Sequence, residues 1–152
     1  MPNLDGGQAD SRSVYDRTMT DHPNALLARR AWDASSRGDA EALRATMHED
    51  IVWRATGRGA PWAGTHKGRD AVVDFLARVG EVSEGFKASL VDILVSDDHA
   101  LFVFHMSLRR RGRSAEVDYM LLGKVQDGLF SEMWTTPLDP ATIENFWAGQ
   151  AV

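Results

Sequence analysis

Four strand-like runs follow one another in the second half of the chain with almost no sequence between them, and this pattern constrains the fold most. The runs span residues 86–95, 100–110, 114–125 and 129–136. Short segments of the type Ser-Asp-Asp, Arg-Gly and Gln-Asp-Gly separate them, which is typical of β-hairpins. We therefore expect a four-strand antiparallel meander.

Helical patterns dominate the part of the chain that precedes this meander. Apolar residues recur at helical spacing over 21–38, where Gly38 ends the run, and Asp39 is placed to cap a second, short helix. A third helix is expected over 69–79, because its apolar residues share one helical face and Gly80 stands where a C-cap belongs.

A strand and a loop connect the second and third helices, and one more helix ends the chain. Residues 50–55 have the pattern of a strand, and residues 56–68 form a glycine-rich loop. Asp139 and Pro140 supply a cap and a first-turn proline for the terminal helix. Helices followed by consecutive strands predict an α+β fold, with about three N-terminal helices on one face of a curved antiparallel sheet.

The composition is that of a globular protein and excludes several classes. Of the 152 residues, 43% are hydrophobic, so we expect a single domain over 21–152 after a flexible polar tail over 1–20. A net charge of −5 argues against a nucleic-acid partner, and the absence of cysteine excludes disulfides and thiolate chemistry. No apolar run is long enough to cross a membrane, so we expect a soluble, cytoplasmic protein with no membrane partner.

Three local strings, taken in order, are similar to one known family. They are MHEDIVW at 47–53, AGTHKGRDAV at 63–72, and QDG at 126–128 followed by Trp134 and Asp139. Together they resemble the nuclear transport factor 2-like superfamily in its SnoaL-like branch, over residues 24–149. The resemblance implies a cone-shaped fold that encloses one apolar pocket and often forms homodimers. Ketosteroid isomerase, limonene-epoxide hydrolase, polyketide cyclases, dehydratases and noncatalytic proteins share this fold, so the fold alone assigns no activity.

The functional groups of two of these enzymes do not carry over. By the resemblance, the hydrogen-bond-donating aspartate of ketosteroid isomerase falls at or beside Leu121, its general base at Ala55 and its helix tyrosine near Ala31. The tyrosine and asparagine of the epoxide hydrolase fall on Trp53 and Ala55, and an acidic group falls near Thr135. Proton transfer in a dry pocket needs a titratable group within hydrogen-bond reach, and these positions carry none.

The turn at Arg111-Gly112 determines which side chains of the meander share a face. A two-residue turn places His105 opposite Asp118 and Phe104 opposite Tyr119. The face with Phe104 and Tyr119 is the more apolar, so we assign it to the concave, helix-covered side. The expected pocket lining is rich in aromatic residues and methionine, and it comprises Trp32, Trp53, Trp62, Phe104, Met106, Tyr119, Leu121, Gly123, Met133 and Thr135.

Such a lining suits a flat or polycyclic apolar ligand, with Tyr119 and Thr135 as the polar groups that fix its orientation. Gly123 stands within a strand, where it either enlarges the cavity for a ligand or marks a β-bulge.

Two histidines are candidates for proton transfer. Asp118 opposite His105 is the geometry that orients an imidazole and raises its pKa, as a general base requires. On the register above, this pair lies on the outer face as a structural or interfacial ion pair, whereas a register shift would turn it inward as a catalytic dyad. His66 is either an acid or base at the pocket mouth or a loop residue packed against Trp62.

No motif indicates a cofactor or a metal. The spacing of His, Asp and Glu is not that of a metal site, and the glycine-rich segments match neither a Walker motif nor a dinucleotide fingerprint. We therefore expect no cofactor and no metal.

The sequence favours a small, cofactor-independent enzyme that resembles SnoaL-like cyclases and isomerases and acts on a hydrophobic polyketide-, terpenoid- or steroid-like metabolite. Tyr119 would donate a hydrogen bond to a carbonyl or enolate, and His105 with Asp118, or else His66, would move the proton. One alternative is a noncatalytic small-molecule-binding or dimerisation module of the same fold. A second is an epoxide hydrolase or dehydratase. The expected partners are a hydrophobic small molecule and a second copy of the chain.

Overall fold

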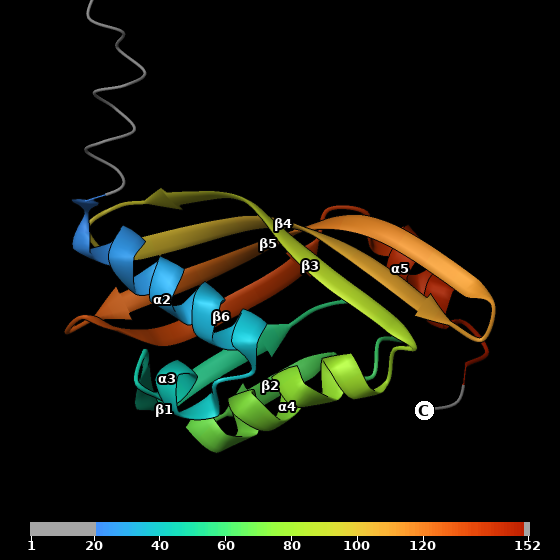
Figure 1. Ribbon diagram of the computed structural model, residues 1–152, viewed down its shortest axis with the longest axis horizontal. Helices are drawn as coiled ribbons and strands as arrows, with labels where there is room; N and C mark the ends of the chain where they lie inside the picture. The colour runs from blue at the N-terminus through green and yellow to red at the C-terminus, as the bar shows by residue number, and fades with distance from the viewer. Residues whose placement is uncertain (1–20, 151–152) are drawn as a thin grey trace, which may run out of the picture.

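The computed structural model describes residues 21–150, so the tail predicted over 1–20 lies outside the described residues. Helices α2, α3 and α4 precede the main run of strands and α5 follows it, as the α+β prediction requires (Figure 1). In chain order the elements are α2 (Pro23–Arg37), α3 (Ala40–Arg44), β1 (Met47–Ala55), β2 (Gly64–Lys67), α4 (Arg69–Glu81), β3 (Gly85–Val95), β4 (His99–Arg110), β5 (Arg113–Gln126), β6 (Leu129–Pro137) and α5 (Pro140–Trp147).

All six strands belong to one sheet, in the order β2-β1-β6-β5-β4-β3. Strands β3 to β6 form the predicted antiparallel meander. Strand β1 pairs with β6 in parallel, with Trp53 beside Met133, so the expectation of a wholly antiparallel sheet is wrong at this pair. The reason is that β1 enters the sheet from the helical half of the chain, and no hairpin turn sets its direction relative to β6.

The predicted hairpin register is confirmed along the whole of β4 and β5. His105 lies opposite Asp118 and Phe104 opposite Tyr119, as a two-residue turn at Arg111-Gly112 requires. Arg111 adopts a positive φ of 47°, which closes the turn in the left-handed conformation that such hairpins need.

Capping residues end and begin the helices largely as the sequence predicts. Gly38 ends α2 in the left-handed conformation, with φ of 67°, and the Asp39 carboxylate accepts the Ala42 N–H of α3 at 3.0 Å. The predicted C-cap at Gly80 is wrong, because α4 continues to Glu81. A glycine inside a helix costs only about 1 kcal/mol, which the burial of α4's apolar face outweighs.

The connection between β1 and α4 differs from the prediction of a loop over 56–68. Residues Gly64–Lys67 form the short strand β2, which pairs with β1 and places His66 beside Trp53. Strand β2 is mostly exposed, so it lacks the alternation of apolar and polar residues that would have indicated it.

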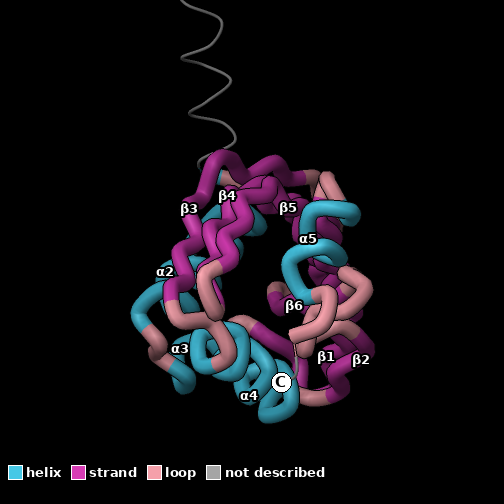
Figure 2. Tube along the Cα trace, turned by 90° about the vertical axis from the view of Figure 1, so that its right-hand side faces the viewer, coloured by secondary structure: helices cyan, strands magenta, loops and turns pink. Residues whose placement is uncertain are grey.

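The sheet bends through a wide arc, and α2, α3 and α4 lie across its open side (Figure 2). The apolar core lies between these helices and the concave face of the sheet, and it includes Leu27 of α2, Ile51 of β1 and Val72 of α4. No helix within residues 21–150 is long and apolar enough to cross a membrane.

Candidate functional site

A cavity of about 610 Å³ lies between the concave face of the sheet and the helices. Its volume falls within the range of about 300–1,000 Å³ that is typical of small-molecule sites. Its exposed lining residues, such as Arg37 and Phe86, gather where the end of α2, α4 and the start of β3 meet, and there the cavity opens to solvent. Eight of the residues predicted to line the pocket do so, namely Trp32, Trp53, Trp62, Phe104, Met106, Tyr119, Leu121 and Thr135.

Aromatic rings hold one another in place around this cavity. The rings of Phe104 and Tyr119 stack with centroids 5.4 Å apart, and Trp32 of α2 lies 5.3 Å from Phe104. Trp53 of β1 meets Phe75 of α4 edge to face at 5.2 Å. Such contacts fix ring positions, so the cavity has rigid, flat walls that suit a flat apolar ligand.

Tyr119 is the most deeply buried polar residue of the lining. It is 0% exposed, and its hydroxyl has no hydrogen-bond partner among residues 21–150. Burial raises the pKa of this phenol above its usual value, so the group keeps its proton. Tyr119 therefore offers the cavity a hydrogen-bond donor and cannot act as a base near neutral pH.

Thr135 supplies the second polar group on the same face. It lies between Leu121 of β5 and Ala55 of β1 in the register of the sheet. The indole N–H of Trp53 donates a hydrogen bond of 2.6 Å to the Thr135 hydroxyl. Tyr119 and Thr135 both line the cavity, as do Thr46 and the exposed residues Ser35, Ser36, Arg37 and Lys87, and the role of Tyr119 and Thr135 in orienting a ligand stays a prediction.

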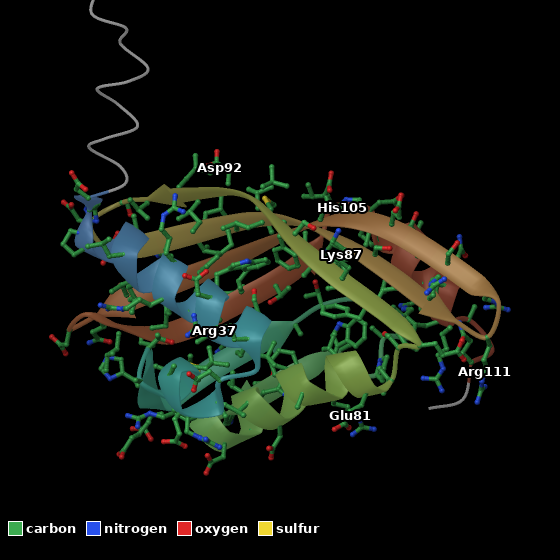
Figure 3. The ribbon with its side chains drawn as sticks, viewed as in Figure 1. Arg37, Glu81, Lys87, Asp92, His105 and Arg111 are labelled. Atoms are coloured by element: carbon green, nitrogen blue, oxygen red, sulfur yellow. The ribbon has the colours of Figure 1, made fainter. Side chains whose placement is uncertain are left out.

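The His105–Asp118 pair lies on the outer face of the sheet, away from the cavity. His105 Nδ1 is 2.8 Å from Asp118 Oδ1, and the two side chains are 40% and 56% exposed. Figure 3 shows His105 on the side of the sheet turned away from the helices. No register shift turns the pair inward, so the reading of these residues as a dyad inside the pocket does not fit their position.

His66 also lies outside the cavity lining, contrary to the hypothesis of a proton-transfer group at the mouth. Its ring stacks on Phe75 with centroids 4.2 Å apart, behind the cavity wall. Its Nε2 is 2.8 Å from the backbone carbonyl of Trp62, and because a carbonyl only accepts, Nε2 carries a proton. His66 therefore supports Phe75 and the Trp62 loop, which is the packing role that the sequence left open.

Comparison with known proteins agrees with this architecture. The family model for the SnoaL-like domain matches residues 28–133. The chain belongs to the SnoaL-like family. The matched region begins in α2 and ends in β6, so it contains the helices and strands that enclose the cavity.

Solved structures of SnoaL-like shape are similar to the chain over most of its length. Bal32a, from a soil-derived mobile gene cassette, is 29% identical with a TM-score of 0.76, over 82% of this chain and 96% of that one. A nuclear transport factor 2-like protein of Burkholderia xenovorans is 22% identical with a TM-score of 0.73, over 84% and 98%. TerC, co-crystallised with polyporic acid, is 20% identical with a TM-score of 0.72, over 84% and 99%. No curated protein matches the chain.

This SnoaL-like cavity has apolar side chains at the positions where the resemblance places enzyme functional groups. Ala31, Ala55 and Leu121 all line it. Within the described part of the chain, the lining contains no aspartate, glutamate or histidine. The groups that move protons in ketosteroid isomerase-like sites therefore have no counterpart here.

Gly123 and Met133, which the sequence predicts in the lining, lie in the packed core beside it. A Cβ at Gly123 would lie 2.6 Å from Phe130 Cε1 and 2.8 Å from Met133 Sδ. The glycine therefore lets Phe130 and Met133 pack against the strand, and it neither enlarges the cavity nor marks a bulge at this position, since Ala100, Gly123 and Met133 stay in register.

Several lining residues escaped the sequence analysis. Phe102 shares the predicted inner face with Phe104, and Phe75 lies on the predicted apolar face of α4, but periodicity does not tell lining from core. No local sequence pattern marks Phe86 and Arg37 as lining residues, because the mouth of the cavity forms only where α2, α4 and β3 meet in the folded chain. Within residues 21–150 no group of three or more His, Asp or Glu side chains is placed to hold a metal ion.

Proposed function

We propose that this SnoaL-like chain is a small enzyme of the cyclase or isomerase type, working without a cofactor on a hydrophobic polyketide-, terpenoid- or steroid-like metabolite. The observation that carries the proposal is Tyr119, which belongs to the lining of an aromatic cavity and whose hydroxyl is buried without a partner among the described residues. Buried polar groups without partners are rare, and in a cavity they are candidates for ligand contact.

The proposed mechanism combines confinement with one hydrogen bond. The rigid walls around Trp53, Phe75 and Phe104 hold a flexible substrate in a conformer in which its reacting atoms are close. Tyr119 donates its proton in a hydrogen bond to a carbonyl oxygen and stabilises negative charge that develops there. Because the described lining holds no carboxylate or imidazole, any proton transfer occurs within the substrate or through water.

The absence of carboxylates and imidazoles from the described lining favours a second candidate, a binding module that holds a small molecule without altering it. An epoxide hydrolase or dehydratase is less well supported, because it needs an ionisable pocket residue. Asp118 faces outward with His105, and Glu132 pairs with Arg54 on the outer face at 3.1 Å. TerC, a protein of the same fold, was crystallised with polyporic acid, which supports a small-molecule ligand for either candidate.

Ligand capture tests this proposal and separates the two candidates. The purified protein is incubated with a metabolite extract of its source organism, and captured compounds are identified by native mass spectrometry and by chromatography before and after incubation. A compound released with changed mass or retention time supports the enzyme, and an unchanged compound supports the binding module. For an enzyme, Tyr119→Phe is expected to lower kcat by about 100-fold with a small change in KM; an unchanged kcat would refute the role of Tyr119.

We also propose that the outer face of the sheet pairs with a second copy of the chain. This face has no cover within the described part of the chain and exposes apolar side chains, with Leu94 43% and Leu122 37% exposed. His105 and Asp118 lie on it as a polar pair, with Nδ1 and Oδ1 2.8 Å apart. Exposed apolar sheet faces bordered by polar pairs are typical of protein interfaces.

The oligomeric state tests this second proposal. Sedimentation equilibrium of the full chain is expected to give a dimer, and Leu122→Lys at the outer face is expected to give a monomer. Leu26→Lys is the matched control, because Leu26 is 48% exposed but belongs to α2, across the sheet from this face. A monomeric wild-type chain, or a dimer that survives Leu122→Lys, would exclude this interface.

A further inference from the structure

Two residues that carry hydroxyl groups lie on the concave face, on neighbouring strands. Leu121 of β5 pairs with Thr135 of β6, and Tyr119 pairs with Pro137. Tyr119 and Thr135 are therefore diagonal neighbours on one face, a relation in which Cα atoms are about 7–8 Å apart and large side chains are within mutual reach. Both residues line the cavity.

The contact with Trp53 determines what the Thr135 hydroxyl can do. An indole N–H only donates, so in the 2.6 Å bond the Thr135 oxygen accepts. The Trp53 ring is 6% exposed and rests against Phe75, which fixes the direction of its N–H. The Thr135 proton is left without an acceptor among the described residues. A hydroxyl that already accepts a hydrogen bond is polarised, and it becomes a better donor.

The other hydroxyl groups of the lining do not compete for this role, and the Lys87 ammonium belongs to an exposed residue. The Thr46 hydroxyl donates to the backbone carbonyl of Leu43 at 2.7 Å, so its proton is occupied. Ser35, Ser36 and Arg37 lie at the exposed mouth. Tyr119 and Thr135 are thus the residues of the described lining, away from its mouth, whose hydroxyl groups have a proton to offer.

We propose that the ligand of this cavity carries a carbonyl-type oxygen, as in a ketone, quinone or lactone, and that Tyr119 and Thr135 both donate hydrogen bonds to it. Trp53 is the positioning residue, because it acts on the ligand through Thr135. This inference rests on the proposed function and narrows its substrate class. It excludes pure hydrocarbons as preferred ligands, because these would leave both donors unpaired.

A matched pair of flat tricyclic probes tests the inference. 9-Fluorenone carries a carbonyl where fluorene carries a methylene group, and the two are otherwise alike. The readouts are the dissociation constants of both probes by calorimetry and the carbonyl stretching frequency of bound fluorenone by infrared spectroscopy. The wild-type chain is expected to bind fluorenone more tightly than fluorene and to lower the carbonyl frequency relative to fluorenone in hydrocarbon solvent.

Variants of Thr135 and Trp53 then test whether these two residues cause the preference for fluorenone and the shift in its carbonyl frequency. Thr135→Val keeps the side-chain shape and is expected to reduce the preference for fluorenone about fivefold, the worth of one hydrogen bond, while Thr135→Ser retains it. Trp53→Phe removes the N–H and is expected to raise the carbonyl frequency of bound fluorenone, a change that a purely structural role would not produce. Trp53→Phe/Thr135→Val removes donor and acceptor together, so it replaces Thr135→Val if that variant fails to fold.

Thr136→Val is the matched control, because it removes the hydroxyl of the residue next to Thr135, which pairs with Met120 and lies outside the cavity lining, and the fluorenone preference is expected to stay unchanged. Equal affinity of the wild-type chain for both probes, or a preference that persists in Thr135→Val, overturns the inference and leaves apolar binding in the cavity intact. If neither probe binds, the proposed apolar site itself fails and the inference fails with it.

Discussion

Replacing Tyr119 by phenylalanine is expected to stabilise the free protein, although the same change weakens the proposed function. The hydroxyl is buried and has no partner among residues 21–150, whereas the ring is stacked on Phe104. Phenylalanine keeps the stacked ring and removes only the unpartnered group. In the unfolded chain the hydroxyl is hydrated, so its removal eliminates a cost that falls on the folded state alone.

The magnitude follows from the surroundings of the hydroxyl. A buried polar group without a partner costs about 1–3 kcal/mol. Tyr119 belongs to the lining of a cavity of about 610 Å³, but it is 0% exposed, so water in the cavity does not reach its hydroxyl and does not reduce this cost. We therefore expect a gain in the middle of this range, about 2 kcal/mol, which corresponds to a rise in Tm of about 6 °C for a domain of this size.

Urea unfolding of the wild-type chain and of Tyr119→Phe measures this difference, with the m-value as a check that both unfold alike. Thr46→Val is the control of opposite sign, because the Thr46 hydroxyl donates to Leu43 at 2.7 Å and its loss is expected to destabilise the fold. If Tyr119→Phe lowers the urea midpoint as Thr46→Val does, the Tyr119 hydroxyl has a partner and the reasoning is refuted.

The same variant has a second signature at high pH. Burial raises the pKa of Tyr119 above its usual value of 10.0, so the fold favours the neutral phenol. The stabilisation that the neutral Tyr119 phenol gives the fold is complete at pH values below the tyrosine pKa in the unfolded chain. It is lost progressively as the pH rises from that pKa towards the raised pKa of the folded chain. Tyr119→Phe is expected to lack this part of the alkaline loss, and unfolding curves at pH 9 to 11 measure the difference.

Two further predictions concern stability. Gly123→Ala is expected to destabilise the fold, because its Cβ would lie 2.6 Å from Phe130 Cε1. Overpacking of this kind costs about 1–3 kcal/mol. Replacing glycine also reduces the conformational entropy lost on folding, but this gain of about 0.5–1 kcal/mol offsets only part of the cost. An unchanged urea midpoint would contradict this packing. The Asp139 carboxylate accepts from the Thr142 N–H and hydroxyl, which lowers its pKa. The stabilisation is present above the usual pKa and is lost on acidification, so Asp139→Asn, which also caps helices, is expected to flatten Tm against pH below about pH 4.

The meander and its register were predictable because local signals determine them. A two-residue turn at Arg111-Gly112 and the period of two along each strand are sufficient to place Phe104 opposite Tyr119 and His105 opposite Asp118. The assignment of inner and outer faces followed from the apolar content of each face. These inferences need only residues close in the chain, which is why they agree with the structure.

Features that depend on distant segments were not predictable in the same way. Strand β1 pairs in parallel with β6, more than 70 residues later in the chain, and no turn records this pairing. The glycine at 123 is explained only by Phe130 and Met133, which pack against it from the next strand. Whether a residue of the inner face lines the cavity or belongs to the packed core depends on the distance between the sheet and helices α2 and α4. The periodicity of apolar residues in the sequence contains no information on that distance.

A cavity that offers donors without a base restricts the reactions it can accelerate. Loss of a single donor costs enzymes of this kind about 100- to 1,000-fold in rate, whereas holding two ends of one substrate together reaches effective molarities of about 10⁵–10⁸ M. The larger part of any acceleration here would therefore come from shape, which Trp53, Phe75 and Phe104 define through their fixed ring contacts. Ring closure from the enol form of a flexible diketone uses both effects: the enol carbon forms a bond to the second carbonyl carbon, and the enol O–H proton passes to that carbonyl oxygen directly or through water, so no base from the protein is needed. Opening an epoxide with water, or eliminating water, needs a carboxylate or an imidazole, and the described lining has neither, so we propose intramolecular carbon–carbon bond formation as the reaction class that best matches this cavity.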